Sequence, residues 1–111
     1  SIGGLCGSRA GAAYTASKFA MIGLTKNIGY QYAKEGIRCN AIAPGAVKTN
    51  IGATITNPNA FGQEKAMTGM GINPRAGEPI EIAQVALFLA SDDSSFVNGT
   101  VITADSGWTA Y

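Results

Sequence analysis

A short apolar segment, residues 37–43, lies between two stretches with helical spacing, and this arrangement restricts the possible folds more than any other feature of the sequence. The segment follows Gly36 and ends at Pro44-Gly45, as a buried parallel strand commonly does. Residues 100–104, which come after the second helical stretch, also have strong β character. Because the order is helix, strand, helix, strand, we predict an α/β fold with parallel strands.

Two helices are predicted around these strands. Residues 12–34 carry apolar side chains at three- and four-residue steps, and Gly36 is placed to end that helix. Residues 79–90 are heavily apolar and begin with Pro79, which suits the first helical position because the N–H it lacks would have no helical partner there. We therefore expect both segments to be helical over these ranges.

The connection between the first strand and the second helix, residues 46–77, is broken by glycines and by two Asn-Pro pairs. A short helix is predicted near residues 61–67. The length of the connection and its Gly and Met content favour a lid over a site, in which residues 50–73 select the substrate. A plain surface excursion is the alternative interpretation.

Tyr14 and Lys18 are four positions apart near the start of the first predicted helix, so their side chains share one face. A phenol normally titrates near ~10, and a cation beside it favours its ionised form. Such a tyrosine can act as a general acid or base on a carbonyl or an alcohol. The same spacing is common on ordinary helices, so the pair carries weight only together with other motifs.

The composition excludes several other functions. The 111 residues suit one domain, and a net charge of +1 without a Lys/Arg run predicts no nucleic-acid partner. No apolar run approaches the ~20 residues of a membrane span, so no membrane interaction is predicted. The absence of histidine excludes Ser-His-Asp and Cys-His catalysis. Cys6 and Cys39 fit no zinc site, so we predict no metal centre and expect two reduced thiols in a cytoplasmic protein.

The order of several motifs resembles the C-terminal part of a single-domain short-chain dehydrogenase/reductase, and the resemblance covers essentially the whole chain. The motifs are Ser1 upstream of Tyr14, Tyr14-x-x-x-Lys18, Asn40-Ala41-Ile42-Ala43-Pro44-Gly45-Ala46-Val47-Lys48-Thr49, Phe88-Leu89-Ala90-Ser91-Asp92, Asn98-Gly99 and Asp105-Ser106-Gly107-Trp108. The chain also starts with Ser1 rather than Met, so we expect it to be part of a longer protein.

The resemblance implies that residues 1–111 are the C-terminal portion of one doubly wound parallel-sheet (Rossmann) domain that binds NAD or NADP. It implies three catalytic residues. Tyr14 would give or take the proton of the substrate oxygen, Lys18 would bind the nicotinamide ribose and favour the phenolate, and Ser1 would polarise the substrate carbonyl. The family's Gly-rich phosphate loop, the residue that selects NAD or NADP, and a further catalytic asparagine lie upstream of the position of Ser1.

The cofactor-binding residues implied by the resemblance are Tyr14 and Lys18 together with the segment that follows the first strand. Pro44, Gly45 and Val47 would approach the nicotinamide through backbone atoms, and Thr49 through its hydroxyl group. Because the phosphate loop is absent, we expect residues 1–111 alone neither to bind a dinucleotide tightly nor to turn over substrate.

The resemblance implies an oxidoreductase that moves a hydride between NAD(P) and a small-molecule carbonyl or secondary alcohol. It also implies a homodimer or homotetramer formed through the long helix and the last helix and strand. An epimerase or dehydratase is an alternative, against which the short tail ending in Asp105-Ser106-Gly107-Trp108 argues. A truncated, non-catalytic chain that retains only the subunit-pairing half is a second alternative.

Overall fold

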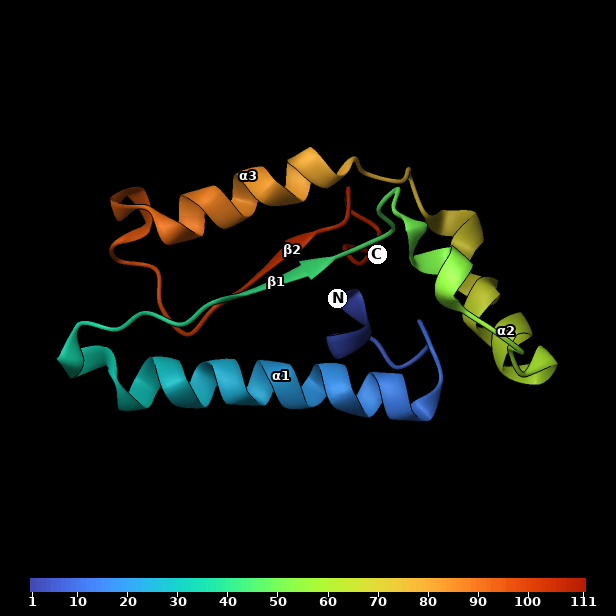
Figure 1. Cartoon of the computed structure of the whole chain (residues 1–111), viewed down its shortest axis with the longest axis horizontal. Helices are drawn as coiled ribbons and strands as arrows, with labels where there is room; N and C mark the ends of the chain where they lie inside the picture. Colours follow the sequence, from blue (N-terminus) through green and yellow to red (C-terminus); the bar gives the residue numbers. More distant parts are fainter.

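A computed structural model describes all of residues 1–111 and shows two parallel strands between two helices (Figure 1). Helix α1 spans Ala12–Gln31, strand β1 Ala41–Pro44, helix α3 Pro79–Ala90 and strand β2 Val101–Ala104. Helix α1 lies on one side of the strands and α3 on the other. The predicted α/β fold with parallel strands is thereby confirmed.

The two strands form one short parallel ladder. It runs in register from the pair Ala41 and Val101 to the pair Pro44 and Ala104. Both strands point toward the two chain termini (Figure 1). The carboxyl ends of the strands therefore face the N-terminal segment, as expected for the ligand-binding edge of a parallel sheet.

The first strand starts later than predicted: residues 37–40 lie outside the ladder, and β1 includes Pro44. Side-chain hydrogen bonds interrupt the ladder in this segment, where the Cys39 carbonyl keeps a backbone partner, the Gly99 N–H, at 2.9 Å. The Cys39 N–H donates to Asn98 Oδ1 at 2.9 Å, and Asn40 Oδ1 accepts from the Thr100 N–H at 3.1 Å. Because the Asn98 and Asn40 side chains bind the N–H groups of Cys39 and Thr100, regular strand pairing begins only at Ala41.

The first helix is shorter than the predicted residues 12–34. Helix α1 ends at Gln31, and a 3-10 turn, Ala33–Glu35, follows it. Gly36 closes that turn in the left-handed region at φ +75°, which glycine adopts without a steric penalty. The prediction that Gly36 ends the first helix is therefore wrong in detail, because Tyr32 caps α1 and Gly36 ends the 3-10 turn that follows it.

Helix α3 has the predicted bounds because its N-terminus is capped locally. Glu78 and Glu81 form a capping box, and Pro79 occupies the first helical position. The Glu81 carboxylate also accepts two hydrogen bonds from the Arg75 guanidinium, at 2.9 and 2.6 Å. These contacts fix the point at which the connection from β1 enters the helix.

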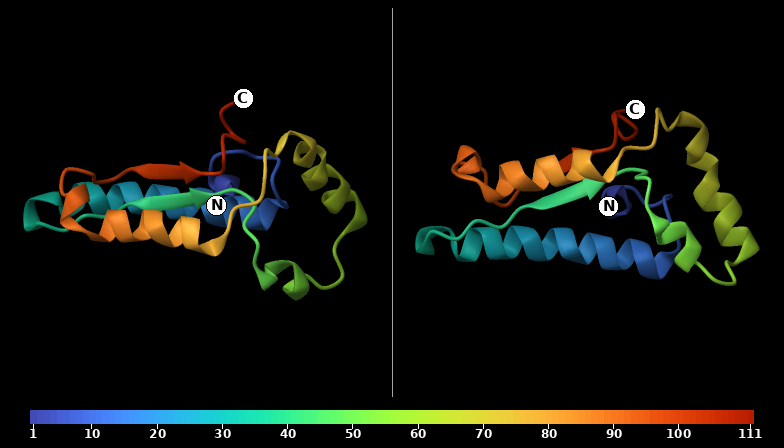
Figure 2. Two further views of the ribbon diagram at one scale, coloured as in Figure 1. Left: turned by 90° about the horizontal axis from the view of Figure 1, so that it is seen from above. Right: turned by 45° about the horizontal axis from the view of Figure 1, so that its top comes forward.

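The connection itself projects from the three layers (Figure 2). It contains the 3-10 turns Asn50–Thr54 and Thr68–Ile72 on either side of helix α2, Ala60–Met67. The short helix predicted near residues 61–67 is confirmed. Asn59 caps it, with its Oδ1 accepting from the Gly62 N–H at 2.9 Å.

The buried core is small and lies at the carboxyl end of β1. Ile2, Ala43 and Trp108 form it, and Ala46 and Val101 pack against it. Large apolar side chains remain exposed on both outer helices: Phe19, Met21, Leu24 and Tyr30 on α1, and Ile80, Leu87 and Phe88 on α3. None of the helices combines the length and the apolar character needed to cross a membrane.

Candidate active site

Ser1 and Tyr14 meet across a glycine. Ser1 caps the 3-10 turn Ile2–Gly4, and its Oγ accepts a hydrogen bond from the Gly3 N–H at 3.0 Å. A Cβ added to Gly3 would lie 2.9 Å from Tyr14 Cε1 and 3.2 Å from Ser1 Oγ. The tyrosine ring and the serine hydroxyl therefore both border the backbone of Gly3, and there is no room for a side chain at that position.

Lys18 lies one helical turn after Tyr14, as predicted. Its Nζ is 5.0 Å from the centroid of the Tyr14 ring. Ser1 and Lys18 also line the same cavity between α1 and β1. The structure thus brings together the three residues that the sequence analysis selected as catalytic.

Close backbone contact holds the N-terminal turn against α1. A Cβ added to Gly4 would lie 2.8 Å from the Lys18 carbonyl oxygen and 2.8 Å from Ile22 Cδ1. Gly3 and Gly4 are both buried. The two glycines allow the turn that carries Ser1 to sit directly on the first turns of the helix that carries Tyr14 and Lys18.

The carboxyl ends of the two strands also approach each other through a glycine. A Cβ at Gly45 would lie 2.7 Å from Asp105 Cβ and 3.5 Å from Trp108 Cε3. Burial by itself raises the pKa of Asp105, but hydrogen bonds from Thr109 and Gly107 outweigh it and lower that pKa. Asp105 therefore stays ionised and holds the turn that places the Trp108 ring beside Gly45.

Val47 leaves one pair of backbone groups free. Val47 and Gly77 form an isolated parallel bridge, in which the Gly77 N–H donates to the Ala46 carbonyl at 2.9 Å and the Lys48 N–H donates to the Gly77 carbonyl at 2.9 Å. In this geometry the N–H and C=O of Val47 itself point away from Gly77. Neither group has a hydrogen-bond partner in the structure.

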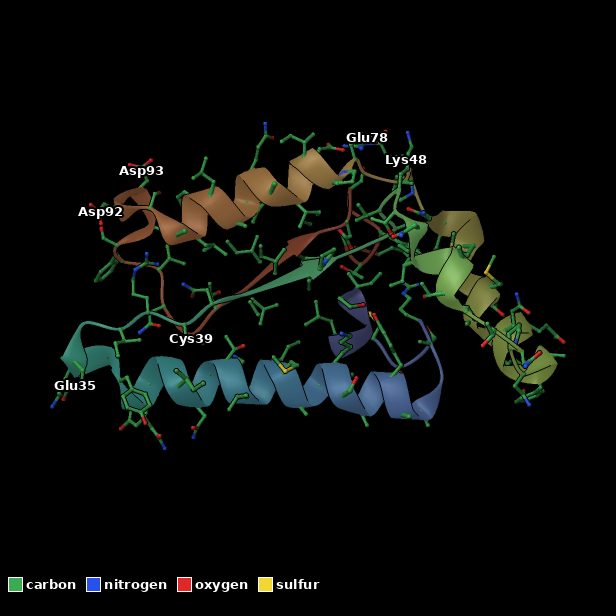
Figure 3. The ribbon with its side chains drawn as sticks, in the orientation of Figure 1. Glu35, Cys39, Lys48, Glu78, Asp92 and Asp93 are labelled. Carbon is green, nitrogen blue, oxygen red and sulfur yellow. The ribbon has the colours of Figure 1, made fainter.

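The bridge also closes the base of the projecting connection. Lys48 and Glu78 form an ion pair there, and Figure 3 shows the two side chains side by side where the chain leaves β1 and returns to α3. Thr49, the last predicted cofactor residue, is exposed, and its Oγ1 accepts from the Ile51 N–H at 3.4 Å. Its hydroxyl proton is free to donate elsewhere.

Two cavities flank the strands. One of about 300 Å³ lies between α1 and β1, and Ser1, Lys18 and Ala43 are among its lining residues. The other, of about 370 Å³, opens at the strand ends on the α3 side and is lined in part by Arg75, Glu81 and Asp105. Arg75 and Glu81 pair with each other, and the Asp105 carboxylate accepts a hydrogen bond from Thr109, so each of these charged groups already has a partner within the chain.

The sequence analysis missed a group of residues beside this site. The Arg9 guanidinium lies over the Trp108 ring, with Cζ 4.4 Å from the ring centroid, and the Trp108 Nε1–H donates to the Gly69 carbonyl at 2.9 Å. Trp108 was recognised only as part of a motif, and Arg9 occurs in a Gly- and Ser-rich loop without periodicity. The structure contains no cluster of His, Cys, Asp or Glu side chains that could hold a metal ion.

Comparison with known proteins identifies the family. The model of the family described as enoyl-(acyl carrier protein) reductase matches residues 1–109. The chain is 54% identical over 111 residues to 3β-hydroxysteroid dehydrogenase 2 of Eggerthella lenta, covering 100% of the chain and 43% of that protein. It is 46% identical over 114 residues to the short-chain dehydrogenase/reductase cdmF of Talaromyces verruculosus, covering 95% of the chain and 44% of that protein.

Solved structures agree with the sequence comparisons. Levodione reductase matches the whole chain with a TM-score of 0.82 at 40% identity, over 45% of its own length. A 4-hydroxyisoleucine dehydrogenase complexed with NADH and succinate matches with a TM-score of 0.77 at 31% identity, covering 100% of the chain and 44% of that structure. A putative 2-deoxy-D-gluconate 3-dehydrogenase from Agrobacterium tumefaciens with bound NADP has a TM-score of 0.70 at 35% identity, covering 88% and 39%.

The chain spans less than half the length of each of these proteins. Within that span the agreement is continuous: the family model covers all but the last two residues, and the fold is the C-terminal portion of a Rossmann domain. The chain belongs to the short-chain dehydrogenase/reductase family of oxidoreductases.

Proposed function

We propose that the natural protein carrying residues 1–111 transfers a hydride between NAD or NADP and a carbonyl or secondary alcohol, with Tyr14 as the general acid and base. The observation that carries this proposal is that Ser1 and Tyr14 meet across Gly3, with the Lys18 ammonium 5.0 Å from the centroid of the Tyr14 ring. Such convergence of a proton donor, a cation and a hydroxyl group suits polarisation of one substrate oxygen.

Tyr14 moves the proton in this proposal. In the direction of reduction its hydroxyl group donates a proton to the substrate oxygen, and in the direction of oxidation the phenolate accepts that proton back. The Lys18 ammonium, 5.0 Å from the centroid of the ring, supplies a positive charge beside the reacting tyrosine in this proposal. The Tyr14 side chain is 41% exposed, so it can reach a substrate without rearrangement of the helix.

Ser1 is the proposed hydrogen-bond donor to the same oxygen. Its Oγ already accepts from the Gly3 N–H, which fixes the position of the hydroxyl group. Its own proton has no acceptor among the hydrogen bonds of the structure, so it can donate to a carbonyl. A fixed donor of this kind stabilises charge on the oxygen without reorganising during the reaction.

The free backbone groups of Val47 support a nicotinamide beside β1. A carboxamide needs one donor and one acceptor, and Val47 offers an unpaired N–H and an unpaired C=O. The Thr49 hydroxyl can add a donor. Pro44 and Gly45 lie at the carboxyl end of β1, where their backbone atoms can approach the same group. When bound, the nicotinamide supplies or accepts the hydride.

The substrate class follows from the relatives as a proposal. The Eggerthella lenta relative, at 54% identity, is named as a hydroxysteroid dehydrogenase, and other relatives are named for levodione, a gamma-butyrolactone or 4-hydroxyisoleucine. We therefore place a ring-borne secondary alcohol or its ketone first. Exposed apolar side chains of residues 50–73, including Ile51, Phe61 and Met70, support an apolar substrate.

The proposal is tested by Tyr14→Phe in the natural protein. Removal of one hydroxyl group is expected to lower kcat by about 100-fold or more, the usual contribution of general acid–base catalysis. Tyr30→Phe, on the same helix and 86% exposed, is the matched control and keeps wild-type kcat. Lys18→Ala is expected to raise KM for the cofactor and lower kcat, and Ser1→Ala mainly to lower kcat. A Tyr14→Phe variant with a near wild-type rate would refute the assignment.

A second candidate function is a non-catalytic chain that only pairs with other subunits. The observation in its favour is the set of exposed apolar side chains on α1 and α3, such as Phe19, Leu24 and Leu87. We propose that these faces join subunits in a dimer or tetramer in either case. Turnover by the natural protein that falls by about 100-fold or more in Tyr14→Phe separates the enzyme from the pairing chain.

A further inference from the structure

Arg9 is the one arginine of the chain without an acceptor. Arg38 donates to the backbone carbonyls of Leu89, Ser91 and Val97, and Arg75 pairs with Glu81. The Arg9 guanidinium takes part in no hydrogen bond or ion pair of the structure, and its Nε is buried without a partner. A guanidinium carries five donors and a permanent charge, so this arrangement leaves strong binding capacity unused.

The guanidinium is nevertheless held in place. It lies over the Trp108 ring at 4.4 Å from the centroid, a cation–π contact. On another side it packs against Gly69, where an added Cβ would come within 2.3 Å of one terminal nitrogen. Trp108 is itself buried and hydrogen-bonded to Gly69. Arg9 is therefore a preorganised cation rather than a free surface side chain.

This cation lies next to the candidate active site. The residue belongs to the loop that connects the turn of Ser1 to the helix of Tyr14. The Trp108 ring on which it stacks also contacts the position of Gly45, with Cε3 3.5 Å from an added Cβ. One aromatic ring thus separates the guanidinium from the backbone proposed to face the nicotinamide. Gly69 belongs to the projecting connection, so its contact with Arg9 also places the guanidinium against that connection.

We propose that Arg9 is a specificity residue that binds a carboxylate of the substrate. The planar fork of a guanidinium matches the two oxygens of a carboxylate, and its single positive charge matches a single negative one. The carboxylate would be separated from the reacting carbon, because Trp108 lies between Arg9 and the proposed nicotinamide position. This inference rests on the proposed function, and it specifies that the substrate carries a carboxylate in addition to the reacting carbonyl or alcohol.

The test compares matched substrates in the natural protein. The probes are 4-oxopentanoate with its methyl ester, and a 3-ketosteroid that ends in a side-chain carboxylate with its methyl ester. Arg9→Gln is expected to lower kcat/KM for the acids on the order of tenfold to a hundredfold, mainly through KM, because a charge-assisted hydrogen bond is lost. The esters, which Arg9 does not bind as anions, are expected to change by less than about threefold.

Two further variants separate binding from a structural role. Arg9→Lys keeps the charge and loses the fork, so it is expected to restore part of the preference for acids. Gly69→Ala displaces the guanidinium and is expected to reproduce the effect of Arg9→Gln while Arg9 itself is present. A wild-type enzyme that prefers the esters, or an Arg9→Gln variant that slows acids and esters equally, overturns the proposal.

A binding measurement distinguishes failure of this proposal from failure of the proposed function. With NADH present, 4-oxopentanoate is expected to raise the melting temperature of the wild type saturably and to leave that of Arg9→Gln unchanged. If this difference appears without turnover of any probe, the carboxylate site stands and the reaction assigned above is wrong. If neither turnover of the acids nor the thermal shift depends on Arg9, the carboxylate site is refuted.

Discussion

Gly3→Ala is expected to slow catalysis while leaving the fold intact. Gly3 has no positive φ, so alanine can adopt its backbone conformation. The new methyl group would lie 2.9 Å from Tyr14 Cε1 and 3.2 Å from Ser1 Oγ, where ordinary contact begins at 3.4 Å. The tyrosine ring must therefore retreat by about 0.5 Å and the serine hydroxyl by about 0.2 Å. Both proposed catalytic groups move, and both move away from Gly3.

The size of the effect follows from the displacement. A misplacement of ~1 Å can cost ~100-fold in rate, so a shift of about half that size is expected to lower kcat by about tenfold, or about 1.4 kcal/mol of activation free energy. Stability should change by less than about 1 kcal/mol, because the tyrosine side chain is half-exposed and can move without disturbing the core.

Two neighbouring glycines serve as controls. Gly7→Ala, in the loop that follows, meets no atom within 4 Å and should leave both kcat and the melting temperature unchanged. Gly4→Ala would press on the Lys18 carbonyl oxygen at 2.8 Å, which is backbone and cannot retreat, so it should lower the melting temperature. The measurements are kcat, KM and thermal melts of the natural protein. Wild-type kcat in Gly3→Ala, or a loss of stability as large as that of Gly4→Ala, would contradict the reasoning.

The remaining predictions concern the fold. Gly29→Ala would bring a methyl group within 2.8 Å of the Gly99 backbone and should destabilise the protein by about 1–3 kcal/mol. Gly23→Ala, on the same helix, would meet no atom within 4 Å and should stabilise the protein by about 0.5–1 kcal/mol. Thermal melts in which both variants shift the melting temperature in the same direction would refute this. Hydrogen bonds from the Arg75 guanidinium and the Glu78 backbone N–H lower the pKa of Glu81 to about 2 from an ordinary value of 4.5. Its stabilising contribution is therefore complete above pH 4.5 and lost as the pH falls toward 2, so the difference in melting temperature between wild type and Glu81→Gln should shrink over that interval and disappear below it.

Elements with local signals were predicted well from the sequence. Helix α3 has its predicted bounds because Pro79 and the Glu78–Glu81 capping box act within one turn. Tyr14 and Lys18 lie one turn apart on α1, as their spacing required. In both cases neighbouring residues determine the structure, so periodicity and capping residues are sufficient evidence.

Features that depend on distant partners were not predictable in the same way. Strand β1 starts at Ala41 rather than at residue 37, and one reason is that the Cys39 N–H donates to the side chain of Asn98, 59 positions away, instead of to a strand backbone. Similarly, Arg9, Gly69 and Trp108 come from three segments without a shared pattern. Residues so far apart in the sequence form no periodic pattern, so their contact can be recognised only in the folded structure.

The same contacts suggest how the projecting connection could open. Its base is closed by the Val47–Gly77 bridge and the Lys48–Glu78 ion pair, so both ends are tied to the sheet and to α3. Its far part is tied to the core by one neutral hydrogen bond, from Trp108 to Gly69, with a net contribution of about 1 kcal/mol. Opening at Gly69 is therefore the less costly movement, and it would uncover the Arg9 guanidinium first. A substrate carboxylate that binds Arg9 would then favour closure, because the cation packs directly against Gly69.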